Sequence, residues 1–74
     1  MNYPGLATSL RNQLNESEWS VVGDYIVKVD KLAWRQNEQA CKLLEDAAKK
    51  AVERDYYRCA ARVLYYYDHF FVAA

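Results

Sequence analysis

The chain contains neither glycine nor proline after Gly23, and this lack of helix-breaking residues constrains its fold more than any other feature. Gly and Pro are the residues that most often end helices and form turns. The single proline, Pro4, suits the first turn of a helix, because its missing N–H would have no partner there. The sequence therefore predicts an all-α fold, a bundle of three or four short helices forming one domain over residues 1–74.

The first two helices are indicated by leucine spacing and by a capping pattern. Leu6, Leu10 and Leu14 follow one another at intervals of four, which predicts a short amphipathic helix. Asn15 stands three residues before Glu18, which is the spacing of a capping box at the start of a second helix.

Residues 19–29 allow two interpretations. Gly23 and Asp24 interrupt a segment rich in β-branched residues and could form the turn of a β-hairpin, which would give an α+β fold with the hairpin packed on two helices. Both faces of that hairpin would be apolar, so its alternation is poor. As a helix the segment forms one apolar stripe, consisting of Trp19, Val22, Ile26, Val29 and Ala33. We favour the helix, although Gly23 in its interior costs about 1 kcal/mol.

Residues 37–72 are expected to form two helices. The inner face of the first is predicted to consist of Ala40, Leu43, Leu44, Ala47, Ala48, Ala51 and Val52. Asp55 is expected to cap the second, whose inner positions are Tyr56, Cys59, Val63, Tyr66 and Phe70. Because no Gly or Pro separates the two, one continuous helix over residues 37–72 is an open alternative.

The C-terminal segment is the main indication of function. Eight of the ten residues from Val63 to Val72 are apolar or aromatic, and a helix that is apolar all round must be covered. Either the N-terminal helix and Trp34 cover it, or another chain does, and we favour another chain. The chain is therefore expected to form a dimer or higher homo-oligomer and to bind a protein partner. The expected partner-binding residues are Tyr65, Tyr67, His69 and Phe71.

Three arginines suggest an alternative function. Arg54, Arg58 and Arg62 stand four apart on one helical face, close to several tyrosines. Guanidinium groups beside aromatic rings can hold a phosphate or stack on a base, so nucleotide or nucleic-acid binding is the second hypothesis. The simpler interpretation is a solvated face whose guanidinium groups pair with nearby carboxylates.

The residues that most often carry catalysis or bind metals are not clustered in this sequence. His69 and Asp68 are adjacent and would point about 100° apart on a helix, which does not suit a catalytic pair. Cys59 would lie about 15 Å from His69 along one helix, at a rise of about 1.5 Å per residue. Cys41 and Cys59 lack the spacing of a zinc site. We therefore expect no enzyme activity, no cofactor and no metal.

Composition narrows the remaining classes of function. Ten basic and ten acidic residues give a net charge of zero, which favours protein binding over strong binding to nucleic acids or membrane surfaces. No apolar run approaches the roughly 20 residues of a membrane span. Two cysteines and no signal-peptide pattern predict a cytoplasmic protein. The sequence thus predicts a small regulator, inhibitor or adaptor that self-associates and binds through its aromatic C-terminal helix.

Overall fold

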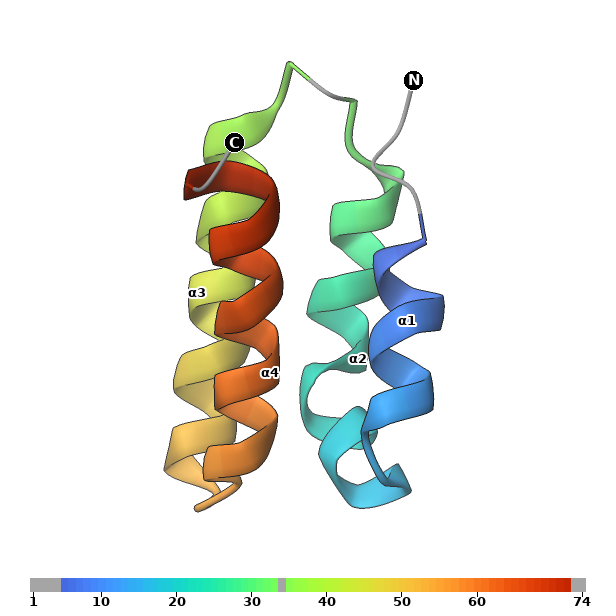
Figure 1. Ribbon diagram of the computed structural model, residues 1–74, viewed down its shortest axis with the longest axis vertical. Coiled ribbons are helices and arrows are strands. Elements are labelled where there is room, and N and C mark those ends of the chain that lie inside the picture. Colours follow the sequence, from blue (N-terminus) through green and yellow to red (C-terminus); the bar gives the residue numbers. More distant parts are fainter. Residues whose placement is uncertain (1–4, 34, 73–74) are drawn as a thin grey trace.

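The computed structural model describes residues 5–33 and 35–72, which form a bundle of four helices (Figure 1). The helices are α1 (Leu6–Gln13), α2 (Glu16–Lys31), α3 (Asn37–Glu53) and α4 (Tyr57–Tyr67), and α4 continues as a π-helical segment over Asp68–Val72. Within the described ranges there is no β-strand, and residues 19–29 are part of α2. The all-α prediction is therefore confirmed and the alternative hairpin is wrong. Pro4 and Trp34 lie outside the described residues.

The four helices form two antiparallel pairs, α1 with α2 and α3 with α4, which pack side by side through α2 and α3 (Figure 1). Three fully buried alanines on α3, Ala40, Ala47 and Ala51, have little side-chain volume and allow neighbouring helices to approach closely. The largest side chains in the core come from all four helices: Leu6, Leu10, Val22, Ile26, Val29, Leu44, Cys59 and Val63.

The start of α2 is fixed by the predicted capping box. The Asn15 side chain accepts a hydrogen bond from the Glu18 backbone N–H at 2.8 Å, and Glu18 Oε1 accepts one from the Asn15 N–H at 3.0 Å. Two backbone donors that a helix start leaves free are thereby satisfied. The Glu18 side chain is only 6% exposed, so this carboxylate is held inside the protein.

Gly23 lies in the interior of α2 because an aromatic ring covers it. A methyl group built on its Cα would lie 2.8 Å from Cε2 and 3.0 Å from Nε1 of Trp19, one turn earlier on the same helix. The Arg11 guanidinium also lies over the Trp19 ring, 5.4 Å from the ring centroid, in a cation–π contact. The glycine therefore marks a close contact within a helix and not a turn.

The α3–α4 connection turns sharply without a glycine. Asp55 adopts a left-handed backbone conformation with φ of 63°. The Asp55 N–H donates to the Val52 carbonyl at 3.0 Å, and the Tyr56 N–H donates to the Ala51 carbonyl at 2.8 Å, which is the Schellman pattern of a helix C-terminus. The prediction that Asp55 caps α4 was therefore wrong, because Asp55 instead ends α3. The single helix over residues 37–72 is excluded by the same turn.

The short helix α1 is held by side chains from other helices. Both carboxylate oxygens of Asp30 on α2 accept hydrogen bonds from α1, from the Leu6 N–H at 3.0 Å and the Ala7 N–H at 2.9 Å. At the opposite end, the Arg58 guanidinium on α4 donates to the Gln13 carbonyl at 2.9 Å. These contacts supply the caps that the residues next to α1 do not provide.

Candidate functional site

The apolar side chains that remain exposed gather mainly on one face of the α3–α4 pair. Among the described residues, the large hydrophobic side chains with the highest exposure are Val27, Val52, Tyr57, Leu64 and Tyr65. Val52 on α3 is 47% exposed, and Leu64 on α4 is 44% exposed. Tyr57 precedes Leu64 by two helical turns and therefore lies on the same flank of α4. Val52 was predicted to face the core, so this part of the prediction was wrong.

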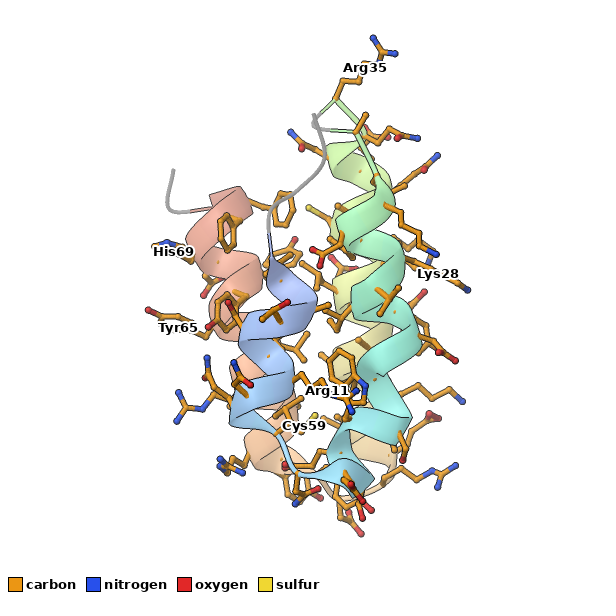
Figure 2. The ribbon with its side chains drawn as sticks, turned by 90° about the vertical axis from the view of Figure 1, so that its right-hand side faces the viewer. Arg11, Lys28, Arg35, Cys59, Tyr65 and His69 are labelled. Atoms are coloured by element: carbon orange, nitrogen blue, oxygen red, sulfur yellow. The ribbon has the colours of Figure 1, made fainter. Side chains whose placement is uncertain are left out.

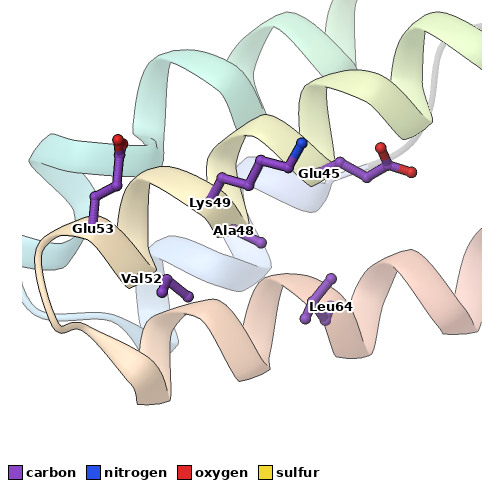
Figure 3. Close-up of a pocket in the computed structure, with 6 residues that line it drawn as sticks. All are labelled: Glu45, Ala48, Lys49, Val52, Glu53 and Leu64. Carbon is purple, nitrogen blue, oxygen red and sulfur yellow. The ribbon is translucent and has the colours of Figure 1, made fainter.

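A groove of about 600 Å³ runs between α3 and α4 at this face (Figure 3). Ala48 and Val52 line its α3 side and Leu64 lines its α4 side. The groove exists because Ala48 is small, so that neither helix fills the space between Val52 and Leu64. Charged residues border it along α3: Glu45, Lys49 and Glu53. A hydrophobic groove is one of the recurring sites that receive the apolar face of an amphipathic helix.

The structure divides the predicted aromatic surface between two flanks of the C-terminal helix. Tyr65 is 60% exposed, and its ring stacks on His69 with centroids 6.1 Å apart. Figure 2 shows these two side chains projecting from the same side of the molecule. Tyr67 and Phe71 instead pack partly buried against the core, and the Tyr67 hydroxyl donates to Glu45 at 3.3 Å. The four residues therefore do not form one patch.

Tyr67 also contacts the α3 side of the bundle near a thiol. The neighbouring Cys41, partial burial and the Glu45 carboxylate together raise the pKa of the Tyr67 hydroxyl above its usual value. This tyrosine is therefore neutral at physiological pH and remains a hydrogen-bond donor to Glu45. Its position shows which flank of α4 faces α3, and Leu64 lies on that flank.

The three arginines also have separate surroundings. Arg58 Nη1 lies 3.4 Å from the buried Glu18 carboxylate, and the same guanidinium binds the Gln13 carbonyl, so Arg58 joins α4 to α1 and α2. Arg54 follows the end of α3 and lines a different cleft, of about 390 Å³, together with Lys28 and Lys50. Arg62 is exposed. The arginine row predicted from the sequence is thus not a single anion site.

The thiol of Cys59 is unsuited to nucleophilic chemistry. Burial, together with the nearby Glu18 carboxylate and against the opposing effect of Arg58, raises its pKa from 9.0 to about 11. The reactive form of cysteine is the thiolate, so Cys59 is unreactive near neutral pH. Among residues 5–33 and 35–72, no three His, Cys, Asp or Glu side chains are placed to hold a metal ion together. No helix in these ranges has the length and apolar character needed to cross a membrane.

Sequence reasoning missed the groove although part of its signal was present. Tyr57, Ala61 and Leu64 repeat at intervals of four and three, which marks a second apolar flank on α4 beside the buried one. The larger and more numerous aromatic residues nearer the C-terminus drew the interpretation towards Tyr65 and Phe71.

Comparison of this chain with protein-family models, with curated proteins and with solved structures gave no match.

Proposed function

We propose that this chain is a non-catalytic protein-interaction module that receives an apolar helix of a protein partner in the α3–α4 groove. The observation that supports the proposal most directly is the pairing of Val52 and Leu64, both nearly half exposed, across an alanine floor. Such a module acts as a regulator, inhibitor or adaptor by covering or joining the helices that it binds.

The energetics indicate what kind of partner the groove needs. Full burial of a Val or Leu side chain contributes about 1.5–3 kcal/mol, so covering the exposed halves of Val52 and Leu64 contributes about 1 kcal/mol each. Association costs at least about 4 kcal/mol in lost freedom of movement. The partner must therefore also cover Tyr57 and reach the charged border along α3. A segment of several helical turns fits this requirement, and a small apolar molecule does not.

Site-specific photo-crosslinking in cells that produce the protein tests this proposal. A photoreactive amino acid is placed at Leu64 in the groove, at Tyr65 on the other flank, or at Val27 on α2 as an equally apolar, exposed control. We expect protein adducts at position 64, few at position 27, and loss of the position-64 adducts when Val52→Asp is added. Adducts at position 65 alone would assign binding to the Tyr65–His69 flank, and no adducts at any position would refute the docking function.

Anion binding is the second candidate, supported by the cleft that Lys28, Lys50 and Arg54 line. Asp24 lines the same cleft, and its single carboxylate offsets only part of the positive charge of the three cations. Binding there would weaken steeply with salt, in proportion to the number of phosphates neutralised. Fluorescence titration with a labelled oligonucleotide at two salt concentrations, using Arg54→Ala as the variant, distinguishes this function from helix docking.

A further inference from the structure

We propose that the occupant of the α3–α4 groove is a basic amphipathic helix, whose apolar stripe is flanked by lysine or arginine; this inference rests on the proposed docking function. The charges around the groove support it. Of the described residues that line the groove, Lys49 is the single cation. Carboxylates surround the groove on both helices, and all of them are exposed: Glu45, Glu53, Asp55 and Asp68.

Two carboxylates lie at the end of the groove towards the C-terminus of α4. The Tyr67 hydroxyl donates to Glu45 at 3.3 Å, which brings this part of α4 level with Glu45. Asp68 follows Tyr67, and its N–H donates to the Leu64 carbonyl, so Asp68 lies one turn after Leu64 on the flank of the groove. Lys49 extends along α3 towards Glu45 (Figure 3) and offsets one of these two charges. A cation bound at this end would meet carboxylates from both helices.

The opposite end of the groove carries the other two carboxylates. Glu53 borders the groove at the end of α3. The Tyr57 hydroxyl donates to Asp55 Oδ1 at 2.9 Å, so the exposed Tyr57 ring and the Asp55 carboxylate are held together. Glu53 also pairs with Lys50 at 3.8 Å, but both side chains are exposed, and such a pair offers little competition. This end therefore presents an apolar ring beside negative charge, which suits the apolar stem and cationic head of a lysine or arginine.

The positive side chains of α4 lie away from the groove, so the neutral chain has an acidic face here. Arg58 joins α4 to α1 and α2 on the opposite flank. Arg62 stands two residues before Leu64, and side chains two apart on a helix point to nearly opposite sides. When Lys49 and Lys50 are each set against one carboxylate, two of the four carboxylates around the groove remain uncompensated. An acidic helix would be repelled by this border, and a basic helix would be attracted to it.

The positions of the carboxylates predict a pattern in the partner. Glu45 and Glu53 are eight residues apart, about 12 Å along α3. A helix that lies along the groove would therefore carry its basic residues two turns apart, at positions i and i+7 or i+8. Its apolar residues at i+3 and i+4 would cover Val52 and Leu64 between them.

Three synthetic helices that differ only in charge test the inference. Each has the length of α3, 17 residues, carries the same apolar stripe, and has Lys, Gln or Glu at the flanking positions. A side-chain cross-link opposite the stripe keeps all three equally helical, which circular dichroism verifies. Fluorescence anisotropy of the labelled peptide with the full chain gives the dissociation constant. Asp68→Lys reverses one charge at the groove, Asp24→Lys makes the same change at an exposed position on α2 as the control, and Val52→Asp blocks the groove.

We expect the Lys peptide to bind about tenfold more tightly than the Glu peptide at about 0.1 M salt, with the Gln peptide between them. The difference should fall below about twofold at about 1 M salt, where the Debye length is about 3 Å. Asp68→Lys should reduce the preference by about threefold or more, and Asp24→Lys should leave it unchanged. Val52→Asp should weaken the binding of all three peptides.

The outcomes separate this inference from the docking function. Equal binding of the three peptides, or tighter binding of the Glu peptide, refutes the basic partner; if Val52→Asp still weakens that binding, the docking function stands. Binding that Val52→Asp leaves unchanged does not occur in the groove and also refutes the inference. If no peptide binds below about 1 mM, the basic partner is refuted, and adducts at position 64 in cells decide whether the docking function survives. Position-64 adducts between two copies of the purified chain would instead identify a second copy as the occupant.

Discussion

Replacing Gly23 by alanine tests the contact that explains this glycine. In an open helix the substitution stabilises by about 1 kcal/mol, because alanine restricts the unfolded chain and favours the helix. In this protein the new methyl group would meet the Trp19 ring at 2.8 Å from Cε2. Inserting a methyl group where there is no room costs about 1–3 kcal/mol. The net result is a protein destabilised by up to about 2 kcal/mol.

A double-mutant cycle separates the two opposing contributions. Trp19→Leu keeps an apolar side chain but removes the ring from Gly23, so Gly23→Ala in that background should stabilise by about 1 kcal/mol. The coupling energy between the two sites should then be about 1–3 kcal/mol. Urea unfolding followed by circular dichroism measures all four proteins without depending on tryptophan fluorescence. If Gly23→Ala stabilises equally in both backgrounds, the ring does not restrict this position and the reasoning fails.

Four further predictions concern a helix cap, an ion pair and the two cysteines. Asp30→Ala should lower the free energy of unfolding by about 1–2 kcal/mol, because the first amides of α1 lose their cap; chemical denaturation measures the loss. Arg58→Ala should lower the free energy of unfolding by about 1 kcal/mol, because the buried Glu18 carboxylate loses its ion pair with the partly exposed Arg58. An unchanged midpoint of unfolding would contradict this role. A thiol reagent at neutral pH should modify Cys41 in the native protein and Cys59 only after unfolding. The pKa of Cys59 is raised from 9.0 to about 11 in the folded protein, so the unfolded state loses the thiol proton at lower pH. The free energy of unfolding should therefore fall as the pH rises through that interval, and it should fall less in Cys59→Ala.

The helices were predictable from the sequence where a local pattern determines local structure. The capping box at Asn15 and Glu18 and the stripe through Val22, Ile26 and Val29 required only residue spacing. The left-handed turn at Asp55 could not be predicted, because helices that end in this way usually carry glycine at that position. Aspartate is among the few other residues that adopt the left-handed conformation.

The candidate site was harder to predict because it depends on how two helices pack. Periodicity placed Val52 on the inner face of its helix. It could not show that α4 leaves the outer side of Val52 uncovered. In the same way, four-residue spacing placed Arg54 and Arg58 on one face, yet Arg58 binds Glu18 whereas Arg54 lies with cations from α2 and α3. Which neighbour a long side chain reaches is decided by residues distant in the sequence.

The attachment of α1 has a consequence for the order of folding. This helix has eight residues, and isolated helices shorter than about 12 residues are marginal in water. The residues that hold its two ends, Asp30 and Arg58, come from α2 and α4, so those helices must be in place before α1 gains its caps. We therefore expect α1 to form late and to open first, with amide hydrogens that exchange faster than those of α2 and α3. Each such opening would expose Leu6 and Leu10 to solvent without unfolding the rest of the bundle.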